Sequence, residues 1–325
     1  MNRSIDLTEG QIYAVTDLHG DWYAYERYRD HFFRLYEAER ADRLLFLGDL
    51  IHGYDDPEED YSLHIVWDIM QLQEAYGSDT VMVLLGNHEL PHIYGVNLSR
   101  GEVSYTPRFE HSLGEFRELV IAFFKSLPFI VRTRGGVLFT HAGPSATTAD
   151  PGVAQTLLSH SHDMLLNLAD RMIDETKVVE MIGRMFGLTA EQYDGMVWQQ
   201  LAVESRDDPR YFDLLRGLIV SNLAEWPALW DFFFSRNEQG LTPRAYERVL
   251  GRFLDAYSAP GFQANVLVSG HIGVQEGVEV ISGYQLRLGS WTHAQPREEG
   301  KYLLVDAAMR VQRAADLLPH VHPMP

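Results

Sequence analysis

The chain has 325 residues, a formal net charge of −19 and no cysteine, so neither a disulfide framework nor a thiolate metal site can form. The negative charge repels phosphate backbones and disfavours a nucleic-acid-binding role. The first ten residues lack the apolar core of a signal peptide, and no apolar run approaches the roughly 20 residues that span a bilayer, so we expect a cytoplasmic protein that does not bind membranes.

Strands and helices alternate over the first 85 residues. Short apolar runs predict strands at residues 11–16, 43–47 and 80–85. Of the segments between them, 22–40 has the pattern of an amphipathic helix, and 61–76 is expected to form the next helix. This alternation predicts a layered α/β protein.

The middle of the chain changes from mixed structure to helices. A helix is expected at 112–126, followed by two strands joined by a hairpin turn at 134–136. From about 145 to 262 one helical pattern follows another, with a capping box beginning at Thr189 and an N-cap at Thr242. His160 and His162 are expected on helix surfaces in this region.

Strands return near the C-terminus, and they complete the predicted domain. They are expected at 264–269, 278–281, 284–288 and 301–306. We predict a single domain over 1–316 that carries a helical insertion or cap at about 145–262. Residues 317–325, which are rich in proline and histidine, are expected to form a loose tail.

Five short polar strings each follow an apolar run that predicts a strand. They are Asp17-Leu18-His19, Gly48-Asp49, Gly86-Asn87-His88-Glu89, His141 in Thr-His-Ala-Gly, and Gly270-His271. Ligands of layered α/β proteins collect at the carboxyl ends of strands, so we expect these side chains to meet. A lone Asp-x-His or Gly-Asp is common and Gly-Asn-His-Glu after a strand is rarer, but all five in this order indicate a site for two metal ions.

The donor types narrow the choice of metal. Asp17 and His19 are two positions apart and can hold one ion, while the carboxylate of Asp49 can bridge two ions. Nitrogen and oxygen donors without thiolate suit Mn, Fe, Zn or Co better than Ca. Two divalent ions leave a net positive charge after two aspartates and a hydroxide, which attracts phosphate.

The same strings carry a resemblance to the calcineurin-like metallophosphoesterases. Their order is similar to that superfamily's pattern, and Asp17 to Gly20, Asn87 to Glu89 and Phe139 to Gly143 resemble the branch of Ser/Thr protein phosphatases and symmetrical dinucleoside tetraphosphatases. So does the ending from Leu288 to Asp306. The resemblance covers about 10–145 and 245–310, and it implies a four-layer α/β/β/α sandwich of two mixed sheets.

The resemblance also implies roles for these residues. The first metal would be held by Asp17, His19 and Asp49, and the second by Asp49, Asn87, His141 and His271. A metal-bridging hydroxide would attack phosphorus in line, and His88 would protonate the leaving oxygen. Two divalent ions, foremost Mn²⁺ with Fe or Zn as alternatives, are the implied cofactors.

The chain departs from that branch where it would clamp phosphate and orient His88. His52 and Gly53 stand in place of an aspartate and an arginine. Asp55, Asp56 or Glu89 could orient His88. The arginines that could replace the clamp are Arg132, Arg206, Arg236 and Arg287.

Three further residues are candidates for contact with the substrate. They are His52, Trp291 and His293, and His293 is a candidate for contact with either substrate or metal. The extra histidine that other superfamily members carry after Gly-His is absent, since Gly273 stands there.

We therefore expect a metal-dependent phosphatase that hydrolyses a phosphomonoester on a protein Ser/Thr residue or a small metabolite. The enzyme alternative is a dinucleoside polyphosphate hydrolase or phosphodiesterase. The alternative outside enzymes is a metal-binding scaffold without activity, which the intact set of ligands and His88 disfavour.

Overall fold

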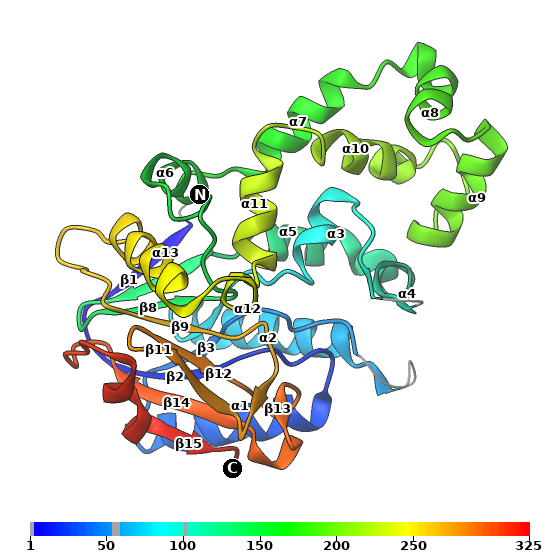
Figure 1. Ribbon diagram of the computed structural model, residues 1–325. Coiled ribbons are helices and arrows are strands. Elements are labelled where there is room, and N and C mark those ends of the chain that lie inside the picture. Colours follow the sequence, from blue (N-terminus) through cyan, green and yellow to red (C-terminus); the bar gives the residue numbers. More distant parts are fainter. Residues whose placement is uncertain (1–2, 54–58, 101–102) are drawn as a thin grey trace. The chain divides into compact units, whose positions relative to one another are not determined.

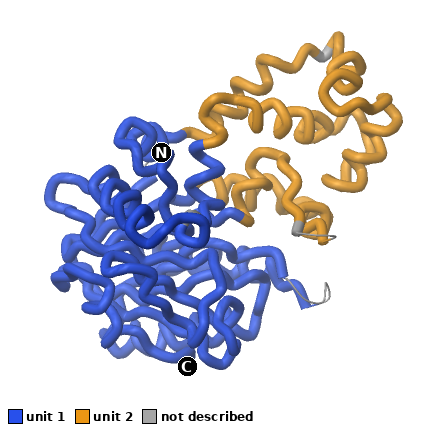
Figure 2. The backbone as a smooth tube through the Cα atoms, viewed as in Figure 1, with its two compact units in different colours: residues 1–87, 127–160, 228–325 blue, residues 88–126, 161–227 orange. Residues whose placement is uncertain are grey.

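The computed structural model describes residues 3–53, 59–100 and 103–325. Within it the chain forms two compact units, shown in Figure 2. Unit 1 holds residues 1–87, 127–160 and 228–325, and unit 2 holds 88–126 and 161–227. The single domain with an insertion at about 145–262 stays a prediction. Asp55 and Asp56, which are candidates for orienting His88, lie outside the described residues.

Unit 1 contains a mixed sheet of six strands, of which β1, β8, β9, β11 and β12 are labelled in Figure 1. In spatial order they are β1 (Ser4–Leu7), β7 (Ile130–Thr133), β8 (Val137–Thr140), β9 (Val266–Ser269), β12 (Gln285–Leu288) and β11 (Val278–Ser282). The central strands β8, β9 and β12 run parallel, whereas β7 and β11 pair antiparallel with their inner neighbours. Every residue of β8 and β9 is buried, which explains why three consecutive apolar residues begin each strand.

A second mixed sheet of unit 1 has five strands. In spatial order they are β15 (Val321–Pro323), β14 (Lys301–Asp306), β2 (Gln11–Val15), β3 (Arg43–Phe46) and β4 (Val81–Val83). The three strands β2, β3 and β4 are parallel, so their carboxyl ends share one edge. A two-stranded ribbon of β10 (Val274–Gln275) and β13 (Ala294–Gln295) lies outside both sheets.

One hydrophobic core joins the two sheets. It takes Ala14 and Leu45 from the five-stranded sheet and Phe139, Val268 and Leu286 from the six-stranded sheet. All five side chains are fully buried. Two mixed sheets with flanking helices confirm the expected fold class, an α/β sandwich of two mixed sheets.

Helices flank both sheets of unit 1. The five-stranded sheet contacts α1 (Trp22–Glu37) through Phe32, whose ring lies 6.1 Å from that of Tyr13, and α2 (Ser62–Tyr76) packs on β4. On the six-stranded sheet, Tyr246 of α13 (Pro243–Ala256) donates a hydrogen bond to Gln285 at 2.5 Å. The remaining helices of unit 1 are α6 (Pro151–Leu158), most of α11 (Trp226–Phe234) and α12 (Asn237–Gly240).

The expected loose tail is wrong. Residues 314–320 form a 3-10 helix, and β15 pairs antiparallel with β14, where Tyr302 faces His322. The rings of Tyr302 and His322 stack at 5.3 Å. The composition of the tail was misleading because backbone pairing at a sheet edge makes little demand on side chains.

Unit 2 is helical and is assembled from two separate parts of the chain. The first part supplies α3 (Leu90–Tyr94), α4 (Tyr105–Leu113) and α5 (Arg117–Ser126), together with the short ribbon β5 (Ser99–Arg100) and β6 (Val103–Ser104). The second part supplies α7 (His162–Met172), α8 (Val178–Phe186), α9 (Ala190–Leu201) and α10 (Asp213–Val220).

Close packing joins the two parts of unit 2. A Cβ added to Gly217 of α10 would lie only 2.6 Å from the carbonyl oxygen of Gly95. The two segments of the chain therefore meet at a position where only glycine fits. The helix expected at 112–126 is interrupted at Gly114, which has a φ of 48°. The capping box at Thr189 is confirmed, because Thr189 and Gln192 exchange both hydrogen bonds.

Candidate metal centre

The five predicted strings follow β2, β3, β4, β8 and β9, as expected. Hydrogen bonds tie neighbouring strings together, since the backbone N–H groups of Leu18 and His19 donate to the carbonyl oxygen of Asp49 at 2.8 and 3.0 Å. The N–H of His271 donates to the carboxylate of Asp17 at 3.1 Å. The strand ends of both sheets of unit 1 therefore converge on one site.

Glycines allow these strings to approach one another. A Cβ at Gly270 would lie 2.2 Å from Oδ2 of Asp17, and a Cβ at Gly48 would lie 2.6 Å from the Cα of Gly86. Neither position has room for a side chain. The glycines of the motifs are explained by this crowding.

Within unit 1 the donor atoms form two groups. In the first, Asp17, His19 and His293 offer atoms within 4.8 Å of one another, and in the second Asp49, His141 and His271 do so. Oδ2 of Asp49 lies 3.8 Å from Nε2 of His19 and 3.4 Å from Nε2 of His141, so this carboxylate lies between the groups.

Asn87 completes the second group. Its Oδ1 lies 2.6 Å from Nε2 of His141 and 2.8 Å from Nδ1 of His271. All six residues that were predicted as ligands are thus brought together within unit 1.

Two of the histidines have a preferred tautomer. Nδ1 of His141 lies 2.8 Å from the carbonyl oxygen of Leu47, and Nδ1 of His19 lies 3.2 Å from that of Ile51. A carbonyl only accepts, so each Nδ1 carries the hydrogen and each Nε2 presents a lone pair to the site. Burial lowers the pKa of His141 and so keeps its ring neutral, although the nearby charge of Asp17 acts in the opposite direction.

The residues fit a pair of divalent cations. Nε2 of His271 is buried and has no hydrogen-bond partner among the described residues. Asp17 is fully buried, and within the described ranges its one ion pair is with His293. A buried carboxylate without a strong cationic partner is costly, and a metal ion would compensate it.

His88 and Glu89 begin unit 2. His88 directly follows Asn87 in the chain, is buried, and has its ring 5.4 Å from that of Tyr105. Glu89 is fully buried and precedes α3. In unit 1, His52 is fully buried, and its backbone N–H donates to Ser62 at 2.8 Å.

The four candidate arginines differ in whether a carboxylate binds them. Arg132 binds Asp6 at 2.6 Å, Arg206 binds Asp194 at 2.5 Å, and Arg287 is paired with Glu238. These three are occupied by carboxylates whose positions in the sequence give no hint of the pairing.

Arg236 differs from the other three arginines. It is exposed, and none of the ion pairs between described residues involves it. Its neighbour Ser235 donates a hydrogen bond to the carbonyl oxygen of Pro144, in the loop that follows His141, at 3.1 Å. The pKa of His271 is lowered well below its ordinary value by burial, then by His141 and by the charge of Arg236. Arg287 also lowers this pKa but is paired with Glu238, so Arg236 is the one of the four candidates without a carboxylate partner among the described residues.

A cavity of about 620 Å³ adjoins the centre at His19. Four aromatic rings line it in two pairs: Trp22 and Tyr61 at 6.3 Å, and Tyr23 and Trp291 at 5.3 Å. Trp291 was a candidate from the sequence, but the other three were missed. The Trp22-Tyr23 pair, which follows the Asp-x-His string after two intervening residues, was the signal for two of them, and Tyr61 had no comparable signal.

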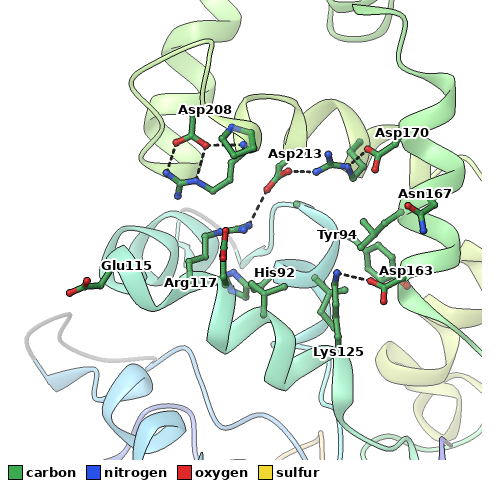
Figure 3. Close-up of a pocket in the computed structure, with 18 of the residues that line it drawn as sticks. His92, Tyr94, Glu115, Arg117, Lys125, Asp163, Asn167, Asp170, Asp208 and Asp213 are labelled. Carbon is green, nitrogen blue, oxygen red and sulfur yellow. Dashed lines mark hydrogen bonds and ion pairs between the residues drawn. The ribbon is translucent and has the colours of Figure 1, made fainter. Parts of the chain in front are cut away.

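The larger cavity, of about 750 Å³, lies within unit 2 and is shown in Figure 3. Its cationic side chains are paired with carboxylates: Arg117 with Asp213 at 3.1 Å, and Lys125 with Asp163 at 2.8 Å. None of the predicted metal ligands is among the described residues that line it. These ion pairs join different helices of unit 2, so we interpret them as stabilising its packing.

Comparison with known proteins agrees with the site. A family described as calcineurin-like phosphoesterase matches residues 10–275, and the chain belongs to this family. It is accordingly a phosphoric ester hydrolase, in a family that typically binds divalent metals. A search among curated proteins finds no match. No helix among the described residues is long and apolar enough to cross a membrane.

Several solved structures have a similar arrangement. A cold-active protein tyrosine phosphatase is 16% identical, with 94% of this chain and 75% of that chain covered and a TM-score of 0.45. A protein serine/threonine phosphatase from Saccharomyces cerevisiae is 13% identical, with 94% and 76% covered and a TM-score of 0.46. A putative diadenosine tetraphosphatase is 21% identical, with 44% and 56% covered and a TM-score of 0.28. These values carry no conclusion about the substrate.

Proposed function

We propose that the chain is a two-metal phosphatase that hydrolyses a phosphomonoester, on a protein Ser/Thr residue or on a small metabolite. The observation that carries the proposal is the position of Asp49, whose carboxylate lies between the donor group of His19 and that of His141. A carboxylate in such a position can bridge two ions.

The proposed ligands divide between two ions. The first would be held by Asp17, His19 and Asp49, and the second by Asp49, Asn87, His141 and His271. When bound, the ions would supply positive charge at the phosphoryl oxygens and an activated water for attack on phosphorus. The nitrogen and oxygen donors suit Mn²⁺, with Fe or Zn as alternatives.

Two residues are proposed to act on the substrate itself. His88 donates a proton to the leaving oxygen, a role that suits an imidazole because its ordinary pKa is near neutrality. Arg236 binds a phosphoryl oxygen in place of the clamp that is missing at Gly53. Its guanidinium is exposed and no carboxylate among the described residues neutralises it, so it can receive an anion.

Asp49→Asn tests the proposed function. The amide keeps the size of the side chain but loses the bridging charge, so we expect hydrolysis of p-nitrophenyl phosphate to fall at least ~10²-fold. Metal content, measured by elemental analysis, should fall in the same variant. Asp79→Asn, at an exposed position, is the matched control. Full activity in Asp49→Asn would contradict the proposal.

The aromatic cavity beside His19 favours a second candidate, hydrolysis of a nucleoside phosphate such as a dinucleoside polyphosphate. Trp22, Tyr23, Tyr61 and Trp291 offer faces for stacking a nucleobase, and Asp21 and Glu26 can accept from its amino group. A substrate panel under Mn²⁺ distinguishes the candidates, with a phosphopeptide, a bis-nucleoside tetraphosphate and glycerol phosphate.

The nucleotide candidate predicts a selective effect of Trp291→Ala. The KM for the bis-nucleoside tetraphosphate should rise about tenfold or more, as the loss of one stacking contact implies. The KM for glycerol phosphate should stay the same. Equal effects on both substrates, or a preference of the wild type for the phosphopeptide, would reject this candidate.

A further inference from the structure

We propose that His293 is a ligand of the ion held by Asp17 and His19, which adds a seventh protein ligand from outside the five strand ends. The proposal rests on the proposed function, since it deepens the description of that metal centre. It concerns the loop between β12 and β13, from Ser290 to His293.

Hydrogen bonds hold this loop against the first polar string. Oγ of Ser290 donates to the carbonyl oxygen of Asp17 at 2.6 Å, and Oγ1 of Thr292 donates to that of Leu18 at 3.2 Å. The carbonyl oxygen of His293 accepts from the N–H of Val274 at 2.8 Å. His293 therefore lies on a segment that is fixed to the proposed ligands on one side and to β10 on the other.

The distance between two ring nitrogens is that of neighbouring ligands. Nε2 of His293 lies 3.0 Å from Nε2 of His19, and both rings are buried. Metal–nitrogen bonds of ~2.1 Å that meet at about 90° place their nitrogens ~3 Å apart. The two imidazoles are thus spaced as adjacent ligands of a single ion.

The charge next to the other nitrogen of His293 favours the tautomer that can bind a metal. Nδ1 of His293 lies 3.5 Å from Oδ1 of Asp17. A lone pair on Nδ1 would be repelled by this carboxylate, so the hydrogen is favoured on Nδ1 and Nε2 keeps its lone pair. His19 also presents a lone pair at Nε2, because its Nδ1 faces the carbonyl oxygen of Ile51. Two lone pairs that lie 3.0 Å apart repel each other, and a cation bound by both nitrogens would remove this repulsion.

A second imidazole would change which metal the first site selects. Asp17, His19 and Asp49 alone would offer this ion mostly oxygen donors, which suit Mg²⁺. Imidazole donors shift the preference toward transition metals. The inference therefore assigns His293 a role in excluding Mg²⁺ from the centre.

Metal binding by His293→Ala and His293→Asn tests the inference. We expect each variant to bind one of its two Co²⁺ equivalents at least tenfold more weakly than the wild type, measured by equilibrium dialysis and elemental analysis. The visible absorption of bound Co²⁺ should change, because one nitrogen donor is lost. His64→Ala, an exposed histidine of α2, is the matched control and should bind both ions as the wild type does.

Two other roles for His293 have different outcomes. A contact with substrate would raise KM and leave Co²⁺ affinity and absorption unchanged, and a hydrogen bond between the two rings would also leave them unchanged. Either result overturns the inference. Pulsed electron paramagnetic resonance on the Mn²⁺-loaded wild type is a check that needs no variant. We expect it to count four coordinated imidazoles, and a count of three would contradict the proposal.

Failure of the inference can be told from failure of the proposed function. If the wild type binds two ions and the His293 variants bind them equally well, the inference alone is wrong. If the wild type binds no metal pair and Asp49→Asn stays active, the proposed function is wrong as well.

Discussion

Several residues of the metal centre have backbone angles that side chains rarely adopt. The φ angles of Asp17, His19, Asp49 and His271 are 32°, 46°, 53° and 68°. Such conformations cost on the order of 1–3 kcal/mol each and persist where surrounding structure enforces them. Here the enforcing structure is the set of hydrogen bonds between strings, which hold the backbone of the proposed ligands in these conformations.

His88→Asn separates proton donation from metal binding. The variant keeps the proposed ligands but loses the imidazole, so kcat should fall by ~10²–10⁴-fold. Metal content by elemental analysis should equal that of the wild type. A variant with unchanged kcat, or with a lost metal equivalent, would contradict the role of His88 as general acid.

The prediction that His160 and His162 lie on helix surfaces is wrong, because both residues are buried. Helical spacing alone could not show this, because burial depends on partners such as Phe129, whose ring lies 5.9 Å from that of His160. Burial, with the nearby charge of Arg3, lowers the pKa of His160 to about 4.

The depressed pKa of His160 predicts a loss of stability in acid. Between pH 6.5 and about 4 the unfolded state binds a proton that the folded state does not, so the free energy of unfolding falls as the pH falls through this window. The contribution is about 3 kcal/mol at ~1.4 kcal/mol per pKa unit. Denaturant titrations at pH 7.5 and pH 4 should show a smaller loss for His160→Gln. An equal loss in both proteins would contradict the buried neutral state.

At the scale of elements, the loops after strands were predictable and the sheet edges were not. Asp17 and His141 could be placed because apolar runs before them marked strand ends. The strand Ser4–Leu7 was missed, since it is short and its parallel partner β7 lies more than a hundred residues away. The strand Val321–Pro323 was hidden by its proline and histidine.

Gly270→Ala tests the close approach of two loops. The added Cβ would lie 2.2 Å from Oδ2 of Asp17, so this carboxylate must move. We expect a weaker affinity for the first metal, seen in elemental analysis after dialysis. Gly251→Ala in α13 is the matched control, because its Cβ meets nothing within 4 Å and helical Gly→Ala stabilises by roughly 0.5–1 kcal/mol. Equal metal content in both variants would contradict the tight packing at Gly270.

At the scale of the whole molecule, the sequence predicted the fold class but not the two compact units. The helical pattern from about 145 to 262 was evident, yet unit 2 combines 161–227 with 88–126. Contacts such as that between Gly95 and Gly217 decide this, and sequence periodicity does not record which helices meet. Similarly, the sequence does not show that Asp6 pairs with Arg132, so it could not rank Arg236 above Arg132 as a phosphate clamp.

The net charge of −19 bears on the whole account of function. A phosphorylated substrate approaches a surface that repels it, so local positive charge is needed at the site. The proposed metal pair and Arg236 would provide that charge, so the proposal assigns metal binding a part in both affinity and chemistry.

The metal content of the active protein tests the central claim most directly. Protein purified without chelator and then loaded with Mn²⁺ should contain close to two equivalents per chain by elemental analysis. Removal of the metal should abolish phosphoester hydrolysis, and Mn²⁺ should restore it. A metal-free preparation with full activity would contradict the account.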